Sequence, residues 1–126
     1  MNKTTNSLNW FEIPANDIKR SSKFYETIFG IEMEMHEMEG SKMAFFPWSE
    51  GSGKANGCLA QGEMNTPSAE GTTVYLNANP NMDNVLTKVE AAGGQIVCPK
   101  MSIGEHGNIA FIIDTEGNKV GIHSIE

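Results

Sequence analysis

Cysteines and basic residues are both scarce in this chain of 126 residues, and their scarcity excludes several classes of protein. Two cysteines, Cys58 and Cys98, are too few for a disulfide framework, and no CxxC pair is present that would predict a zinc ribbon. We expect both thiols to be reduced and buried. Nine Lys and Arg residues stand against 16 Asp and Glu residues, which gives a net charge of −7. Because nucleic acids and anionic membranes are bound through clustered basic residues, we expect neither as a partner.

Long hydrophobic runs are also missing. No apolar segment approaches the roughly 20 residues that a membrane-spanning helix needs. Residues Met1 to Ser7 are polar and no apolar stretch follows them, which argues against a signal peptide and favours a cytoplasmic protein. Hydrophobic residues still make up 39% of the chain, a share that is typical of globular proteins. Length and composition therefore predict one domain over residues 1–126, with residues 1–6 flexible.

The first half of the chain opens on a predicted strand and helix. Residues 8–14 have the pattern of a strand, and Asn16 or Asp17 is placed to cap a helix that runs to about Phe29. Gly30 then occupies the position at which a helix usually ends.

The second half repeats this pattern. Residues 72–78 are predicted to form a strand, Asn79 or Asn81 to cap a second helix, and Gly93 to end it. A shift of 63 positions, half of the 126-residue chain, brings the two segments into register. Such a repeat indicates the duplication of one module.

Each predicted helix is followed by three further strand-like segments, so each half has the order βαβββ. These segments are 31–38, 42–47 and 57–61 in the first half, and 95–101, 108–114 and 119–125 in the second. Asp114 to Asn118 are predicted to form the last turn, with Gly117 at positive φ. Module one spans about 8–62 and module two about 71–125. The predicted fold class is α+β, in which the two modules form a curled mixed sheet with a concave ligand trough and the helices outside.

Two segments at opposite ends of the chain resemble a known family. The run FEIPANDIKRSSKFYETIFG and the closing run FIIDTEGNKVGIHS are similar to motifs of the vicinal oxygen chelate superfamily, which is the glyoxalase, bleomycin-resistance and dioxygenase superfamily. The resemblance covers roughly residues 8–125. It implies a single domain of paired βαβββ modules that often forms a homodimer. It also implies that metal-dependent members bind one divalent ion on the concave face through His, Gln or Glu side chains.

The resemblance places the metal ligands at positions where this chain has unsuitable residues. The first ligand position falls on Trp10, the second on Thr73 and the last on Gly121. Near the fourth strand, only Cys58 and Gln61 offer donor atoms. An indole N–H cannot ligate a metal, and a neutral hydroxyl is a poor ligand for a transition metal. We therefore expect no metal ligands and no cofactor, with a divalent metal disfavoured.

The alternation of side chains along the strands predicts the remainder of the concave face. Phe11 and Ile13 should pack beneath the first helix, and Val74 and Leu76 beneath the second. The residues predicted to line the trough are Trp10, Glu12, Thr73, Tyr75, Gly121 and His123. Two aromatic walls, a carboxylate and an imidazole would surround a small molecule there, and Gly121 would leave room for it.

Each candidate residue also has a plainer explanation. Trp10 either stacks on a planar ligand or is a core side chain that fills the space a metal ion would occupy. Glu12 is either a general base or an exposed carboxylate. His123 is either its acid–base partner or a structural residue, and His106 either closes over a ligand from its Gly-flanked loop or is solvated. His36 is predicted to lie on an exposed strand face.

Three functions remain open at this point. The missing ligand set and the aromatic, Met-rich trough favour metal-independent small-molecule binding, as the resemblance implies for bleomycin-binding relatives. The alternative is an enzyme of the lyase, isomerase or dioxygenase type with a changed site, in which Glu12 is the base and His123 or His106 its partner. The third is a non-catalytic assembly module. The superfamily contains lactoylglutathione lyases and dioxygenases, so the sequence leaves open whether the protein is an enzyme. The expected partners are a small-molecule ligand and a second copy of the chain.

Overall fold

The computed structural model describes all residues, 1–126, and consists of two modules with the same strand order. In the first sheet, called sheet A here, the strands are β1 (Trp10–Pro14), β4 (Asn56–Gln61), β3 (Ser41–Phe45) and β2 (Glu34–Met38), in that spatial order. In sheet B they are β5 (Tyr75–Asn77), β8 (Lys119–Ser124), β7 (Asn108–Ile113) and β6 (Gln95–Ser102). The first two strands of each sheet are parallel and the others antiparallel. The predicted α+β class with two βαβββ modules is confirmed.

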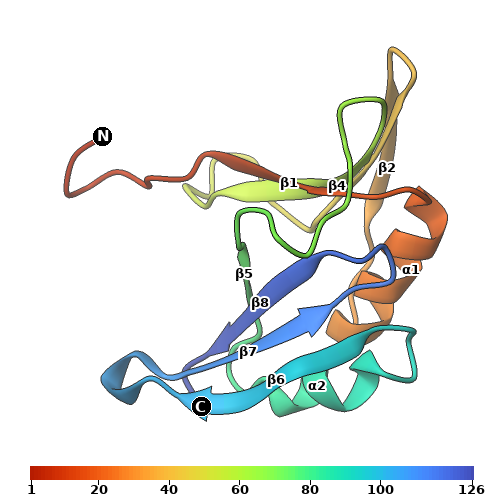
Figure 1. Ribbon diagram of the computed structural model, residues 1–126. Helices are drawn as coiled ribbons and strands as arrows, with labels where there is room; N and C mark the ends of the chain where they lie inside the picture. Colours follow the sequence, from red (N-terminus) through yellow and green to blue (C-terminus); the bar gives the residue numbers. More distant parts are fainter.

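The two sheets are separate. Strand β1 pairs only with β4, and β5 pairs only with β8, so these two strands are free edges of their sheets, as are β2 and β6 at the opposite ends. Figure 1 shows sheet A above sheet B, with the first helix beside both of them. The predicted curled sheet is therefore present as two four-stranded halves in one chain.

Helix α1 (Ile18–Phe29) begins and ends as the sequence predicts. The carboxylate of Asp17 accepts hydrogen bonds from the backbone N–H groups of Lys19 and Arg20, both at 3.1 Å. These bonds satisfy two of the N–H groups that have no partner within a helix. Gly30 ends the helix in the left-handed conformation with φ of 64°, which glycine adopts without steric cost.

Helix α2 (Asp83–Val89) begins later than predicted, and neither candidate residue caps it. Its N-cap is Met82, which has no side chain that could accept a hydrogen bond. Asn79 instead accepts a bond from the N–H of Ile125 at 2.8 Å. Asn81 does accept the N–H of Asp83 at 2.9 Å, but from a position before the cap. Gly93 follows the helix with φ of 105°, as predicted for a glycine at its end.

Three strands begin later than the sequence pattern suggests. The segment predicted at 8–14 starts at Trp10, the one at 31–38 starts at Glu34, and the one at 72–78 contains only Tyr75–Asn77. The Gly-flanked loop around His106 contains a single 3-10 turn, η1 (Gly104–His106).

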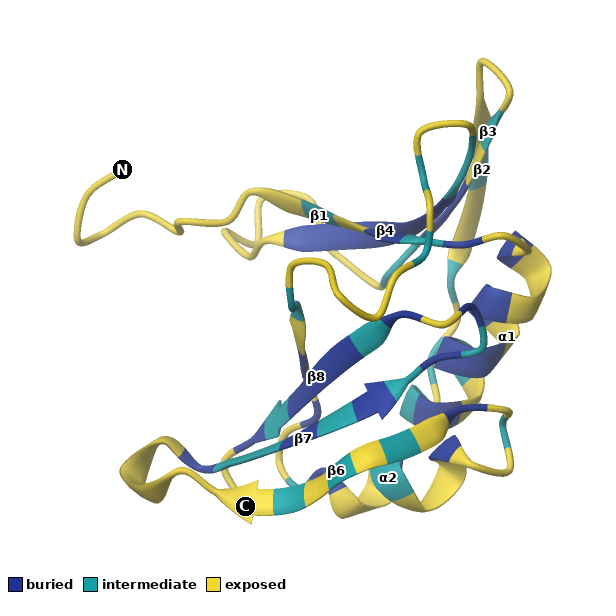
Figure 2. Ribbon diagram, viewed as in Figure 1, coloured by how far each residue is buried: buried dark blue, intermediate teal, exposed yellow.

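One hydrophobic core joins the two modules. It contains 17 buried residues from both sheets and both helices, among them Ile13, Leu59, Leu76 and Ile122. Figure 2 shows these buried stretches on β4, β8 and α1, whereas most of the loops and the N-terminal segment are exposed. Phe11 and Val74 are half-buried and pack against this core, so the core-facing assignments made from alternation are confirmed. No helix is long and apolar enough to cross a membrane.

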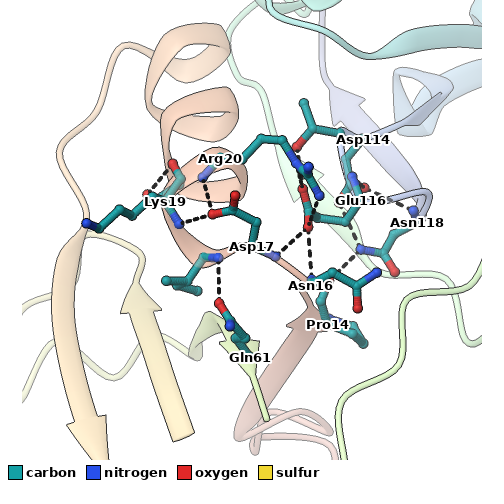
Figure 3. Close-up of polar contacts among 12 residues, drawn as sticks. Pro14, Asn16, Asp17, Lys19, Arg20, Gln61, Asp114, Glu116 and Asn118 are labelled. Carbon is teal, nitrogen blue, oxygen red and sulfur yellow. Dashed lines mark hydrogen bonds and ion pairs between the residues drawn. The ribbon is translucent and has the colours of Figure 1, made fainter.

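A buried carboxylate also links the modules. Glu116, in the turn between β7 and β8, accepts the backbone N–H groups of Asn16 and Asp17 at 2.9 and 2.8 Å (Figure 3). The Arg20 guanidinium donates two more hydrogen bonds, at 2.7 and 3.0 Å. Burial alone would raise the pKa of Glu116, but the bonds from Arg20, Asp17, Thr115 and Asn16 together lower it. The predicted turn is therefore also a contact between the modules.

The neighbouring Asp114 extends this network. Its carboxylate accepts a hydrogen bond from the buried Tyr25 hydroxyl of α1 at 2.6 Å. The same carboxylate accepts the backbone N–H groups of Glu116 and Asn118. The side-chain amide of Asn118 donates to the carbonyl of Pro14 at 2.7 Å, which ties the turn to the end of β1. Burial, followed by the charge of Asp114, raises the pKa of Tyr25 well above its usual value.

Candidate functional site

A row of aromatic side chains crosses the outer face of sheet A, the face turned away from the core. Ile13 on β1 is buried in the core, and successive side chains of a strand alternate, so Trp10 and Glu12 point outward. The Trp10 ring meets the Phe45 ring edge-on, with 5.1 Å between centroids. The His36 ring stacks on the other side of Phe45 at 4.3 Å and 30°. Trp10 remains 41% exposed, so the row has an open end that faces solvent.

Glu12 and Cys58 lie beside this row on adjacent strands. They are direct neighbours in the register of β1 and β4, and the Cys58 Sγ lies 4.0 Å from the Glu12 Oε2. Cys58 is fully buried, whereas Glu12 is exposed. Burial and then the charge of Glu12 raise the pKa of Cys58 to about 12. The thiol is therefore protonated at neutral pH, which makes it a weak nucleophile and a poor metal ligand.

The outer face of sheet B carries a second, smaller aromatic group. The rings of Tyr75 and Phe111 lie 5.7 Å apart, and the Lys119 Nζ lies 5.8 Å from the centre of the Phe111 ring. Gly121 faces Tyr75 across the β5–β8 pair. A Cβ atom added at Gly121 would lie 2.5 Å from the Tyr75 ring. The prediction that Gly121 leaves room for a ligand is therefore wrong, because the Tyr75 ring already fills that room.

The two candidate histidines of module two lie together. The His123 Nε2 is 2.7 Å from the backbone carbonyl of His106. Since a carbonyl only accepts, this ring nitrogen carries the hydrogen, and in the neutral ring Nδ1 is left as the acceptor. The His106 side chain itself is exposed and faces Glu105, with 3.7 Å between them. Thr73 lies half-buried just before β5.

The predicted trough residues are thus divided between the two sheets. Trp10 and Glu12 lie on sheet A, whereas Tyr75, Gly121 and His123 lie on sheet B. Within one chain the structure brings Trp10 and Glu12 together, and His123 and His106 together, but the sheets share no strand pair that joins the two sets.

The side chains present do not fit a divalent metal ion within one chain. No group of three or more His, Cys, Asp or Glu residues is placed to hold an ion. Trp10, Thr73 and Gly121 lack usable donors, and the Cys58 thiol is protonated at neutral pH. A divalent ion needs several strong donors to replace its hydration shell, and a single neighbouring carboxylate, Glu12, does not provide them.

Sequence reasoning missed Phe45 and its contact with His36. The His36 side chain is 40% exposed on a largely exposed strand, as expected, but its ring also stacks on Phe45. The signal was present in the short β2–β3 hairpin. His36 lies opposite Met43 there, and Phe45 is two residues further along the same face. Alternation alone could have placed Phe45 on the same face as Trp10, but only the strand register shows which rings are its neighbours.

Comparison with known proteins assigns the family. The family model of the Glyoxalase/Bleomycin resistance protein/Dioxygenase superfamily matches residues 7–122. The chain belongs to this superfamily. The earlier resemblance to the vicinal oxygen chelate proteins is therefore confirmed over nearly the whole chain.

Relatives of this superfamily resemble the chain in sequence and in fold. A Mycobacterium bovis protein described as a candidate glyoxylase is 29% identical over 117 residues, which are 90% of this chain and 44% of that protein. A mutant glyoxalase I from Zea mays superposes with a TM-score of 0.70 at 21% identity, covering 91% of this chain and 45% of that one. A glyoxylase/bleomycin resistance protein/dioxygenase domain from Frankia sp. superposes with a TM-score of 0.71 at 12% identity, covering 98% and 100%. The chain spans less than half the length of the curated relative, and the structural likenesses establish the fold alone.

Proposed function

We propose that the outer face of sheet A binds a planar small molecule without a metal ion. The observation that carries this proposal is the row of Trp10, Phe45 and His36. The Phe45 ring contacts both of the others, and the Trp10 ring at the end of the row is exposed to solvent. A planar ligand stacked on the exposed indole would extend this row, and aromatic pairs contribute about 0.5–1.5 kcal/mol beyond the area that they bury.

Glu12 places a negative charge beside Trp10, although Lys119 lines the same pocket. Its exposed carboxylate lies on the same face as Trp10, and its neighbour Cys58 carries no charge at neutral pH. A ligand with an N–H group or a positive charge beside its ring would be favoured, and a ligand anion at the same place would be repelled. Nitrogen heterocycles therefore fit the face better than aromatic acids.

We propose that a second copy of the chain completes the site. Exposed rings lie on both outer faces, with Trp10 41% exposed on sheet A and Tyr75 48% exposed on sheet B, and β1 and β5 have free edges. A homodimer in which sheet A of one copy meets sheet B of the other would cover both rings. It would also place Tyr75 and His123 of the second copy opposite Trp10 and Glu12. Light scattering on the purified protein should give twice the chain mass of 13.8 kDa; a mass of one chain at micromolar concentration would contradict the dimer.

Metal-independent binding is tested on protein treated with EDTA. Quinoline, 2-naphthol and 2-naphthol-6-sulfonate are titrated while tryptophan fluorescence is followed. We expect quinoline to bind more tightly than 2-naphthol-6-sulfonate, and 2-naphthol to bind more tightly than its sulfonate, which adds an anion to the same ring system. Trp10→Ala should abolish the fluorescence change, whereas Trp48→Phe should retain it, because Trp48 lies in the loop after β3 and donates to the Lys54 carbonyl instead. The expectation of a cytoplasmic protein remains a prediction.

A second function, an acid–base enzyme, is favoured by the fixed tautomer of His123. Its Nε2 hydrogen bond to the His106 carbonyl leaves Nδ1 free to take a proton. In the proposed dimer, Glu12 of one copy would act as the base and His123 of the other as its partner. Because relatives carry glyoxylase names, the adduct of methylglyoxal and glutathione is the first substrate to test. Turnover that is unchanged by Glu12→Gln and by His123→Ala would contradict this second function.

A further inference from the structure

A cavity of about 640 Å³ lies between the two modules, on the core side of sheet A. Its module-one wall is formed by Phe11, Ile28, Phe29 and Phe46, and its module-two wall includes Leu76 and Val85. Eleven of the 17 lining residues are hydrophobic. A cavity of this size and composition is in the range of small-molecule sites in proteins.

This cavity is separate from the aromatic row on the outer face. Phe11 lines it, whereas Glu12, the next residue of β1, points to the opposite face. Trp10, Phe45 and His36 are not among its lining residues. Tyr75, on the edge strand β5, is the one residue of the predicted trough that borders the cavity.

The charge of the cavity is opposite to that of the chain. The chain has 16 acidic and nine basic residues, yet none of the acidic residues lines the cavity, and Lys88 is its only charged lining residue. The Lys88 ammonium forms no ion pair with another side chain. Lys88 is exposed at the border of the cavity, and a cation without an ion-pair partner beside apolar walls favours an anion whose remainder is apolar.

Asn84 adds a neutral donor beside this cation. It also lines the cavity, and it precedes Lys88 by four residues in α2, so the two side chains lie on the same helix face one turn apart. No hydrogen bond within the chain uses the Asn84 side chain. An ammonium and an amide N–H on one helix face can both donate to a single carboxylate.

We propose that the cavity between the modules binds an apolar monocarboxylate, with Lys88 and Asn84 on the carboxylate and the aromatic wall of module one on the hydrocarbon part. The class includes medium-chain fatty acids and arylalkyl carboxylates. It differs from the ligand class proposed for the outer face, where Glu12 disfavours an anion. The two sites can therefore be distinguished by the charge of the ligand.

The test uses octanoate, with 1-octanol as the uncharged ligand of equal chain length, on the full chain labelled with ¹⁵N. Octanoate should give saturable shifts of the backbone amides of Phe29, Leu76 and Asn84. Lys88→Met should weaken octanoate roughly fivefold, the upper value for an exposed ion pair, and leave 1-octanol unchanged. Lys23→Met, an exposed lysine of α1 outside the cavity, is the matched control and should change neither affinity.

A second variant tests the location of the ligand without changing any charge. Ala55 is exposed and borders the cavity, so Ala55→Trp should narrow it and weaken both ligands without disturbing the core. The proposal is overturned if octanoate causes no saturable shifts, if Lys88→Met and the wild type bind it equally, or if the shifts centre on Trp10 and Phe45. The last outcome would assign octanoate to the outer face and leave the cavity without this ligand.

Discussion

The carboxylate of Glu116 accepts two hydrogen bonds from the guanidinium of Arg20, at 2.7 and 3.0 Å, although 96 residues separate them. The Glu116 side chain is fully shielded from solvent, whereas that of Arg20 is half exposed. Because Glu116 also accepts two backbone N–H groups at the start of α1, one side chain of module two holds the chain segment between β1 and α1 of module one. This carboxylate therefore adds a polar contact between the modules to their shared hydrophobic core.

Glu116→Gln should therefore destabilise the protein. Removal of the charge weakens the bonds from Arg20 and from two N–H groups, and we expect the free energy of unfolding to fall by about 1–3 kcal/mol at pH 7. Urea denaturation measures this change. Glu90→Gln, at the exposed end of α2, is the control and should stay within about 0.5 kcal/mol of the wild type. Equal losses in the two variants would contradict the structural role of Glu116.

The same pair predicts a dependence on pH. The pKa of Glu116 is lowered in the folded protein, so its stabilising effect is complete above the unfolded pKa of about 4.3 and is lost as the pH falls through the lower folded value. The stability difference between wild type and Glu116→Gln should therefore be constant from pH 7 to about 5 and shrink below about 4. A difference that grows on acidification would contradict the sign of the shift.

Tyr25→Phe should also destabilise the protein, because it removes the 2.6 Å bond to the Asp114 carboxylate. Loss of one partner of a buried carboxylate costs about 1–3 kcal/mol, measured as the free energy of unfolding in urea. Tyr75→Phe is the matched control, since its hydroxyl makes no hydrogen bond within the chain and Tyr75 is 48% exposed. A neutral effect of Tyr25→Phe would show that the bond adds nothing to stability.

The two cysteines should react at different rates. Cys58 is fully buried and its pKa is raised to about 12, so at pH 8 it is protonated and shielded from reagents. Cys98 is partly exposed. Iodoacetamide at pH 8 should label Cys98 first, and Cys58 only after unfolding, as read by mass spectrometry of peptides. Comparable rates for both thiols in the folded protein would contradict the buried position of Cys58.

Gly121→Ala should displace the Tyr75 ring, since a Cβ atom there would lie 2.5 Å from it. Overpacking of this kind costs about 1–3 kcal/mol in the free energy of unfolding. If the clash with Tyr75 is the cause, Gly121→Ala should cost much less in a Tyr75→Ala background, and a double-mutant cycle measures that coupling. Additive losses would show that another neighbour opposes the methyl group.

Local features of the fold were predictable from the sequence, and features set by distant contacts were not. Asp17 and Gly30 bound α1 as expected, because both act through atoms within one helical turn. The start of α2 was misassigned because the Asn81 carboxamide is shared between Asp83 and Lys100, and the N–H of Met82 is taken by Ser124. Both of these partners, Lys100 and Ser124, come from later strands, whose positions the local pattern does not contain.

The candidate site shows the same division. Alternation placed Trp10 and Glu12 correctly on the face opposite Ile13. The stacking of His36 and the filling of the space at Gly121 both depend on strand register, which pairs β2 with β3 and Tyr75 with Gly121. Without the strand register, the sequence predicts which face of the sheet a side chain lies on, but not which side chain of the adjacent strand it contacts.

The most direct test of the proposed function is a quinoline titration without and with added metal ions. Quinoline is titrated by calorimetry into wild type and Trp10→Ala, first after the protein has been treated with EDTA and the EDTA removed, and then in separate samples that contain one equivalent of zinc, nickel, manganese or iron(II). Stacking on the indole predicts that the wild type binds with the same affinity in every condition and that Trp10→Ala loses about tenfold, the equivalent of 1.4 kcal/mol. Binding that requires an added ion, with one ion held per chain, would contradict a metal-independent site.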